Sequence, residues 1–290
     1  MNSNQENKKV WFVTGASKGL GLTLTKTLLA EGFRVAATSR SATALTVAVG
    51  ENSENFLPLE MDLLSEQSVR ESIDKTLETF GRIDVVVNNA GYGQIGTLEE
   101  LSDEESRKNF DVNVFGVLNV IRRVMPHLRG QRAGHIFNIS SIGGYTANFP
   151  GWGIYCATKF AVAALTQSLS AEAKEFGVHA TVVYPGTFRT NFLENGSIGL
   201  PENPIAEYSE ARKSQDLFKN EINGNQLGNP EKAAAALIRI ASETNPPLHL
   251  FLGSDAFNVA NATISEVQKD LENWKALTLS TDFEEGKAVA

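Results

Sequence analysis

Short runs of apolar and β-branched residues alternate along the chain with longer segments in which apolar positions recur at helical spacing. The short runs predict strands over 10–14, 33–38, 56–60, 84–87, 135–140, 179–184 and 248–252. The longer segments predict helices over 20–30, 65–80, 102–128, 154–176 and 230–244. This alternation favours an α/β fold with one doubly wound parallel sheet of about seven strands and helices on both of its faces.

Two segments depart from the alternation. Residues 187–228 contain many Gly, Pro and Asn residues with apolar residues among them. A connection of this length inside one domain is more often a lid than a passive loop, so we expect a substrate lid; the alternative is that its apolar residues only pack it against the body. Residues 277–290 show no periodicity and predict a mobile tail. With 1–8 as an N-terminal extension and no internal linker, residues 1–290 predict a single domain.

Composition narrows the range of partners. Of the 290 residues, 42% are hydrophobic and 21% charged, and the net charge of −8 argues against binding to nucleic acid or to an anionic membrane. No apolar run is long enough to span a membrane. The single cysteine, Cys156, excludes an internal disulfide and suits a reducing compartment. Because the four histidines are scattered, we expect no metal site. Together, the composition and the single cysteine lead us to expect a cytoplasmic protein.

A glycine-rich turn joins the first strand to the first helix, with the sequence Thr14-Gly15-Ala16-Ser17-Lys18-Gly19-Leu20-Gly21. Glycines allow a tight turn and close backbone approach, and a helix N-terminus offers free N–H groups to an anion. The turn therefore predicts a seat for the pyrophosphate of a dinucleotide. Its spacing is not that of the general G-x-G-x-x-G fingerprint, and the alternative is a strand-to-helix turn that merely requires glycine.

The end of the second strand bears on which nucleotide is bound. A site selecting NAD usually places Asp or Glu there, but this chain has Ser39 and Arg40. A hydroxyl and a guanidinium suit the 2′-phosphate of NADP(H), and Lys18 in the glycine turn adds a second positive charge. We therefore expect NADP(H) rather than NAD(H), although either basic residue alone is compatible with ordinary surface charge.

Tyr155 and Lys159 lie four residues apart at the start of a predicted helix, and so on one helix face. A nearby ammonium stabilises a phenolate and lowers the tyrosine pKa, which suits the phenol to proton exchange with a carbonyl/alcohol pair. The same spacing on an exposed helix is usually a solvated pair. Ser140 and Ser141, at the end of the fifth strand, offer a hydroxyl that can hold a carbonyl oxygen beside Tyr155.

Taken together, these motifs resemble the classical short-chain dehydrogenase/reductase family from about residue 9 to residue 252. Six family motifs occur in order: the turn Thr14 to Gly21, Asp62, Asn88-Asn89-Ala90-Gly91, Asn113, Ser141 with Tyr155 and Lys159, and Pro185-Gly186-Thr187-Phe188-Arg189-Thr190. Their joint order and spacing are specific to the family. The resemblance implies a Rossmann-type fold and an oxidoreductase that uses a nicotinamide cofactor.

The resemblance also implies a catalytic tetrad of Asn113, Ser141, Tyr155 and Lys159. Tyr155 would exchange the substrate proton, Ser141 would position the carbonyl oxygen, and Lys159 would tune Tyr155 and hold the nicotinamide ribose. Asn113 would anchor a water that relays protons to solvent; the alternative is a helix amide that satisfies a neighbouring backbone group. We choose Ser141 over Ser140 because Ser141-Ile142-Gly143-Gly144 matches the family's Ser-x-x-Gly.

Residues from six parts of the chain would hold the cofactor. For Asp62 the predicted role is to accept from the adenine amino group, and the alternative is a helix N-cap. Asn88-Asn89-Ala90-Gly91 would pass close to the flat ligand and tie strand ends together. The implied cofactor residues are Gly15, Ser17, Lys18, Gly19, Leu20, Gly21, Ser39, Arg40, Asp62, Leu63, Asn89, Ala90, Gly91, Tyr155, Lys159, Pro185, Gly186, Thr187 and Thr190.

The function that this resemblance implies is NADPH-dependent reduction of a ketone or aldehyde to an alcohol, reversible as an alcohol dehydrogenase. The sequence is similar to the 17β-hydroxysteroid-dehydrogenase-like branch, which implies a bulky apolar substrate. The resemblance to the family as a whole implies a homodimer or homotetramer, formed through the helices over 102–128 and 154–176. A nucleotide-binding regulator without turnover is the alternative from another class. Bacterial enoyl reductases space tyrosine and lysine more widely than Tyr155 and Lys159.

Overall fold

The computed structural model describes residues 8–50, 52–193 and 196–283, and the structural statements below refer to those ranges. Three predicted segments extend beyond them: residues 1–7 of the N-terminal extension, 194–195 of the lid and 284–290 of the tail lie outside the described residues.

A seven-stranded sheet forms the centre of the fold, and all its strand pairs are parallel. The order is β3-β2-β1-β4-β6-β7-β9, so the chain builds outward in one direction from β1 and then reverses between β1 and β4. This arrangement confirms the predicted doubly wound, Rossmann-type sheet. The strands are β1 (Val10–Val13), β2 (Arg34–Ser39), β3 (Phe56–Glu60), β4 (Val85–Asn88), β6 (Gly134–Ile139), β7 (Val178–Pro185) and β9 (His249–Leu252).

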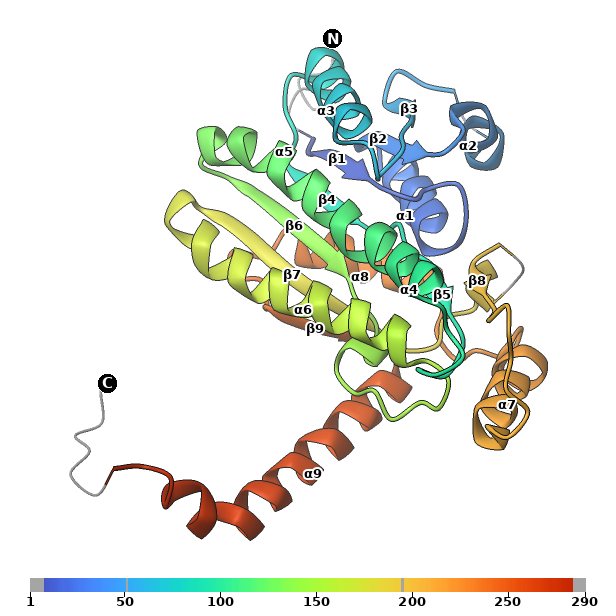
Figure 1. Ribbon diagram of the computed structural model, residues 1–290. Helices are drawn as coiled ribbons and strands as arrows, with labels where there is room; N and C mark the ends of the chain where they lie inside the picture. Colours follow the sequence, from blue (N-terminus) through green and yellow to red (C-terminus); the bar gives the residue numbers. More distant parts are fainter. Residues whose placement is uncertain (1–7, 51, 194–195, 284–290) are drawn as a thin grey trace.

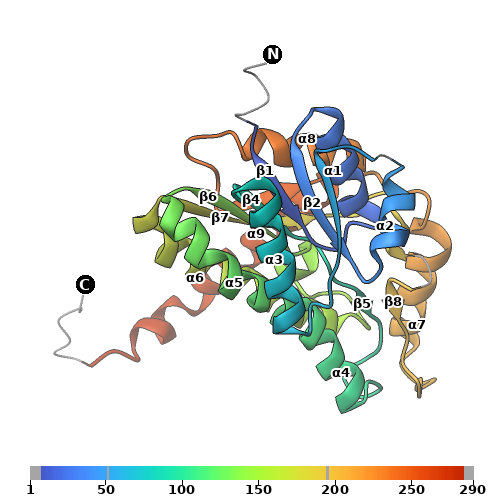
Figure 2. The same cartoon turned by 90° about the horizontal axis from the view of Figure 1, so that it is seen from above.

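Helices cover both faces of the sheet (Figures 1 and 2). On one face α1 (Gly19–Ala30) and α8 (Pro230–Ile240) pack on each other and on a core that includes Trp11 and Val13. On the other face lie α3 (Glu66–Phe80), α5 (Gly116–Gln131) and α6 (Gly153–Ala173), over a core that includes Val10 and Phe12. Successive residues of β1 therefore serve opposite cores. Burial on both sides explains why this strand is apolar at every position.

The predicted helix over 102–128 is one continuous rod with a change of hydrogen-bond register inside it. It begins with α4 (Asp103–Phe110), passes through the π-helical segment η1 (Asp111–Phe115) and continues as α5. Ser102 and Glu105 form a capping box at its start. In η1 the amide of Gly116 donates to the carbonyl of Asp111, five residues back. Such π-turns are frequent at functional sites, and this one contains Asn113.

Two helices lie where no element is predicted. Helix α2 (Ala42–Val49) is short and rich in β-branched residues, so its helical pattern is weak; the Ser41 hydroxyl caps it and Gly50, at φ +73°, ends it. Helix α9 (Ser254–Leu279) follows β9 and projects away from the body in both views (Figures 1 and 2). It continues three residues into the predicted tail, which therefore begins as helix. Apolar residues at 257, 264, 267, 271 and 274 recur at helical spacing and are the sequence signal for α9.

The predicted lid, residues 187–228, has structure of its own. Strand β8 (Ile198–Gly199) pairs in parallel with β5 (Gly93–Gln94) and so ties the lid to the body. Helix α7 (Ser209–Asp216) leads directly into the π-helical segment η5 (Leu217–Ile222), and both lie beside β5 and β8 at one end of the molecule (Figure 1). No helix within the described ranges combines the length and the apolar character needed to cross a bilayer.

Candidate active site

The glycine turn between β1 and α1 can be formed only with glycine at its key positions. Gly15 has φ +67°, and a Cβ there would lie 2.7 Å from the Cα of Ala90. A Cβ on Gly21 would lie 2.5 Å from Nδ2 of Asn89 and 2.7 Å from the Gly15 carbonyl oxygen. The turn is thus pressed against the end of β4, and the first turn of α1 is left open to an anion.

The end of β4 holds the neighbouring strands in place. The side-chain amide of Asn89 donates to the carbonyls of Thr14 (3.0 Å) and Gly15 (3.1 Å). The backbone N–H of Asn89 donates to the Thr14 hydroxyl at 3.0 Å. In the same way Asn88 donates to Asn138 of β6 at 2.8 Å. These hydrogen bonds join the ends of β1, β4 and β6, as predicted for the Asn88-Asn89 pair. They lie at the point where the strand order reverses, which is where ligands bind in sheets of this kind.

Two other predicted cofactor residues, Lys18 and Thr190, lie at this turn, and Arg40 lies at the end of the neighbouring strand β2. Thr190 reaches the turn from the far side, because a Cβ on Gly19 would lie 3.7 Å from the Thr190 Cβ. Lys18 begins α1 without a side-chain cap, and its ammonium donates to the lid carbonyl of Gly196 at 3.0 Å. Arg40 follows β2 and is exposed, so its guanidinium can turn toward a ligand.

Asp62 does not act as the helix cap that the sequence left open. The hydroxyl of Ser65 caps α3 by accepting from the amide of Ser68, whereas Asp62 accepts from the amide of Leu64 at 3.0 Å. Its carboxylate lies in the turn after β3, next to Leu63. The side chain thus closes a local turn and keeps acceptor capacity for a ligand.

Tyr155 and Lys159 are both buried on α6, with 8% and 5% of their surfaces exposed. The Lys159 ammonium lies 5.7 Å from the centre of the Tyr155 ring and donates to the carbonyl of Ile139 at 2.9 Å. The Ser141 hydroxyl hydrogen-bonds with Tyr155, whereas Ser140 donates to the Lys159 carbonyl at 2.8 Å. Of the two serines, it is therefore Ser141 that faces the phenol.

Burial dominates the proton affinities of this pair. It raises the pKa of Tyr155 above its usual value, an effect that the hydrogen bond with Ser141 opposes. It lowers the pKa of Lys159 to about 8. The expected lowering of the Tyr155 pKa by Lys159 is thus outweighed, because the lysine is itself desolvated and directs its ammonium to a backbone carbonyl. Tyr155 therefore holds its proton at neutral pH.

The side chain of Asn113 satisfies backbone groups of Tyr92, which is the second of the two roles that the sequence suggested for it. Its side chain accepts from the amide of Tyr92 at 3.0 Å and donates to the carbonyl of the same residue at 2.9 Å. It also donates to the Thr158 hydroxyl at 3.0 Å, and Thr158 is the residue before Lys159 on α6. A Cβ on Gly91 would lie 3.0 Å from the Asn113 oxygen and 3.5 Å from the Lys159 ammonium. Asn113 thereby fixes the distance between the end of β4 and α6.

The loop after β7 is held by a residue that the sequence did not indicate. Asp255, in the first turn of α9, accepts from the amide of Thr187 at 2.6 Å and from its hydroxyl at 2.7 Å. Gly186 is necessary here, because a Cβ on it would lie 2.1 Å from the Asp255 carboxylate. The partners are 68 residues apart in the sequence, and no local pattern signals the contact.

An apolar cluster from the lid and the body covers Tyr155. Its ring lies 5.6 Å from that of Trp152 and 6.0 Å from that of Phe192, and Trp152 in turn packs on Phe218 of η5 at 5.0 Å. The remaining members of the cluster are Ile95, Phe149, Cys156, Leu193 and Ile198. Beside it, a cavity of about 760 Å³ lies between the lid and the body, and Leu98, Phe149 and Tyr208 are among its lining residues.

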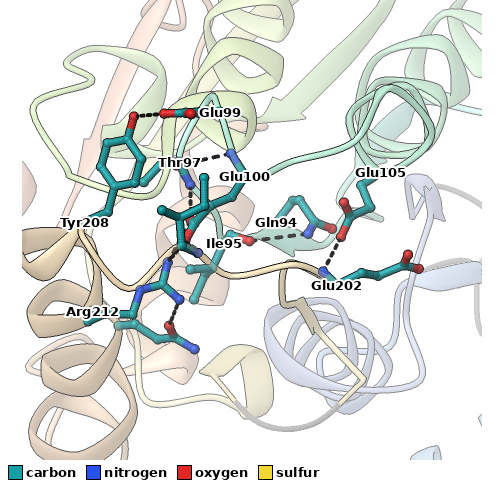
Figure 3. Close-up of polar contacts among 11 residues, drawn as sticks. Gln94, Ile95, Thr97, Glu99, Glu100, Glu105, Glu202, Tyr208 and Arg212 are labelled. Atoms are coloured by element: carbon teal, nitrogen blue, oxygen red, sulfur yellow. Dashed lines mark hydrogen bonds and ion pairs between the residues drawn. The ribbon is translucent and has the colours of Figure 1, made fainter.

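Glutamates preceding and opening α4 attach the lid to the body (Figure 3). Glu100 accepts from the amide of Ile205 at 2.7 Å and pairs with Arg212 of α7 at 2.7 Å. Glu99 hydrogen-bonds with Tyr208, and Glu105 accepts from the amide of Glu202 at 3.1 Å. Burial raises the pKa of Glu100, but the backbone amides of Thr97 and Ile205, with Arg212, outweigh it and hold the pKa below its usual value. Sequence patterns did not indicate these contacts, since they join distant segments.

Comparison with known proteins gives consistent results. The family model described as short chain dehydrogenase matches residues 9–198. The oxidoreductase BOA17 of Botryotinia fuckeliana is 34% identical, over 94% of this chain and 99% of its own length. The 3-ketodihydrosphingosine reductase of Bacteroides thetaiotaomicron is also 34% identical, over 84% and 88%. A short-chain dehydrogenase structure from Streptomyces avermitilis superposes with a TM-score of 0.86 at 34% identity, over 94% of this chain and all of its own.

More distant structures contain nicotinamide nucleotides. The 3-ketoacyl-(acyl-carrier-protein) reductase of Brucella melitensis, complexed with NADH, is 25% identical with a TM-score of 0.71 over 84% of this chain and 96% of its own. The protein ElxO, with NADP bound, is 27% identical with the same TM-score over 87% and 99%. Both nucleotides thus occur among the similar structures, so a nicotinamide cofactor is supported without selecting between them.

Proposed function

Because this chain belongs to the short chain dehydrogenase family of oxidoreductases, we propose that it is an NADPH-dependent reductase that converts a ketone or aldehyde to an alcohol, reversibly. The observation that carries the proposal is the contact of the half-buried Ser141 with the buried Tyr155, next to the buried Lys159, beside the end of β4. A protonated phenol next to a hydroxyl, in a water-poor site, is suited to donating a proton to a carbonyl oxygen as the carbon is reduced.

The residues around the glycine turn fit a dinucleotide. A Cβ on Gly15 or Gly21 would fill the cradle between β1 and β4, and the open N-terminus of α1 faces the same space. We assign the adenosine side to Ser39, Arg40 and Asp62, and the nicotinamide side to the loop from Pro185 to Thr190. The nicotinamide, when bound, supplies the hydride.

The protein's own groups control the proton and the orientation of the substrate. Tyr155 donates its proton to the carbonyl oxygen, and Ser141 holds that oxygen by a hydrogen bond. Lys159 supplies a cation with a pKa near 8 behind the phenol, where it can bind the ribose hydroxyls and restore the proton to Tyr155. Asn113 keeps α6 at the right distance from Gly91 through Thr158.

Two features support the choice of nucleotide and of substrate class. After β2 the chain offers Ser39 and the exposed cation Arg40 in place of an acid, which favours a 2′-phosphate. The aromatic cluster around Tyr155 favours a bulky apolar carbonyl compound, and a relative at 34% identity is named for a ketone, 3-ketodihydrosphingosine. We therefore propose NADP(H) and an apolar ketone.

Two further proposals concern the assembly and its location. Phe115 and Phe160 lie on η1 and α6 with 51% and 42% of their surfaces exposed, which supports a homodimer or homotetramer through these helices. The single, buried Cys156 suits a reducing compartment, and we propose a cytoplasmic protein.

The test is a spectrophotometric assay of reduced-nicotinamide absorbance over a panel of apolar ketones, with NADPH and with NADH. We expect turnover with NADPH and a loss of at least about a hundredfold in kcat for Tyr155→Phe, because the phenolic proton is removed while the ring still packs on Trp152. The matched control is Tyr145→Phe, since Tyr145 packs on Tyr184 and Phe251, outside the cluster. Normal turnover by Tyr155→Phe would refute the assigned acid. Nucleotide binding without turnover on any carbonyl compound would favour a regulator.

A further inference from the structure

The attachment of the lid to the body is concentrated at one buried carboxylate. Glu100 has a fully buried side chain, with 0% exposed, and each of its oxygens accepts two hydrogen bonds. One oxygen accepts from the amide of Ile205 and from Arg212, both at 2.7 Å. The other accepts from the amide of Thr97 at 2.8 Å and from Arg212 at 2.7 Å.

Both oxygens of Glu100 need hydrogen-bond partners, because burying a carboxylate costs free energy of folding unless each of its oxygens is paired. One nitrogen of the Arg212 guanidinium, Nη2, donates to both oxygens at once, so the cation lies at the centre of the carboxylate. Two outer contacts lie on either side of it: Glu99 with Tyr208, and Glu105 with the amide of Glu202 (Figure 3). Glu100 is the buried centre of this set.

The anchored helix is the one that forms the wall of the site. Arg212 lies in α7, which continues without a break into η5. Phe218 of η5 packs on Trp152 with ring centres 5.0 Å apart, and Trp152 packs on Tyr155 at 5.6 Å. Next to Arg212, Ala211 lies against Gly151, where an added Cβ would be 3.3 Å from the alanine Cβ. The contact at Glu100 is thus connected with the aromatic cover of the candidate acid.

We infer that Glu100 is a positioning residue for the substrate: by holding α7 and η5 through Arg212, it keeps the apolar wall closed over Tyr155. This inference rests on the proposed function. A large apolar substrate needs that wall, whereas a small ketone contacts little of it. The nucleotide residues after β1, β2 and β7 lie outside the contacts of Glu100, so nucleotide binding does not depend on this pair.

The experiment compares Glu100→Gln with wild type and with Glu104→Gln, a control one turn further on at an exposed position of α4. Steady-state kinetics use 2-decalone as the bulky ketone and butan-2-one as the small one, and NADPH affinity is measured by fluorescence titration. We expect the KM for 2-decalone to rise about tenfold, and the KM for butan-2-one and the Kd for NADPH to change less than about twofold. An unchanged KM for 2-decalone, or equal losses for both ketones and NADPH, would overturn the inference.

A second measurement does not require turnover. Limited trypsin digestion reports opening of the lid, because Lys213 and Lys219 lie in α7 and η5. We expect cleavage there to accelerate about fivefold in Glu100→Gln and to stay unchanged in Glu104→Gln. If wild type reduces none of the ketones in the panel, the proposed function fails while the digestion still tests the lid attachment, and equal cleavage rates in wild type and Glu100→Gln would overturn that attachment. If Glu100→Gln does not fold, Arg212→Gln, which removes the cation from the pair, must show the same changes.

Discussion

The contact between Asp255 and Thr187 should hold the proposed nicotinamide loop in place. Its perturbation is Asp255→Ala, which leaves the amide and the hydroxyl of the half-buried Thr187 without their acceptor. A hydrogen bond to a charged group contributes about 1.5–3 kcal/mol, and two such bonds at a half-buried site give an expected loss of about 2–3 kcal/mol. For a chain of this size, the loss corresponds to a decrease in Tm on the order of 5 °C.

The assay combines thermal unfolding with nucleotide titration. Thr187→Val removes only the hydroxyl bond, so it should cost about 1 kcal/mol and should be coupled to Asp255→Ala in a double-mutant cycle. Asp270→Ala, on the exposed part of α9, is the matched control. We also expect the Kd for NADPH to rise about fivefold in Asp255→Ala, because the loop from Pro185 to Thr190 loses its brace. A coupling energy of zero, or a Tm equal to that of the control, would refute the reasoning.

Three further predictions follow from the same geometry. Gly21→Ala should weaken NADPH binding by at least about tenfold in a fluorescence titration, because its Cβ would meet the Asn89 side chain at 2.5 Å; unchanged binding would contradict the tight turn. Arg40→Asp should weaken binding of NADPH and spare NADH, and equal effects on both would rule out a 2′-phosphate contact. Burial lowers the pKa of His135 to about 3. Below about pH 6.5 this histidine is protonated in the unfolded chain but stays neutral in the native protein. The free energy of unfolding should therefore fall as the pH decreases from 6.5 toward 3. In thermal melts at pH 5 and pH 7.5, His135→Gln should show a smaller difference than wild type, whereas the control His127→Gln, on α5, should not.

The arrangement of the sheet was accessible from the sequence because its signals are local. Strands buried on both faces must be apolar throughout, as in Val10–Val13, and the helices between them must repeat their apolar positions with helical period. The glycine turn was likewise readable, since Gly15 adopts a conformation that other residues rarely tolerate. The i, i+4 spacing of Tyr155 and Lys159 put both side chains on one helix face before any fold was known.

The candidate site needed more than local signals. The family motif favours Ser141 over the adjacent Ser140, but only the packing of α6 against β6 shows the physical difference: Ser141 meets the Tyr155 phenol, whereas Ser140 donates to the Lys159 carbonyl. The π-turn at Asn113 was also hidden, because one shift in register inside a long helix hardly alters the apolar pattern. The effect of Lys159 on the Tyr155 pKa was misjudged, since spacing shows proximity but not burial.

By itself, therefore, the sequence determined what depends on neighbours within a few residues: the periods of strands and helices, the glycine turn and the pairing of Tyr155 with Lys159. The tertiary structure decided the contacts between segments far apart in the chain. Glu100 and Arg212 are separated by 112 residues and Asp255 and Thr187 by 68, and no local pattern in the sequence signals either contact. Their meaning comes from burial, because the water that weakens such pairs at a surface is excluded only once the chain has folded.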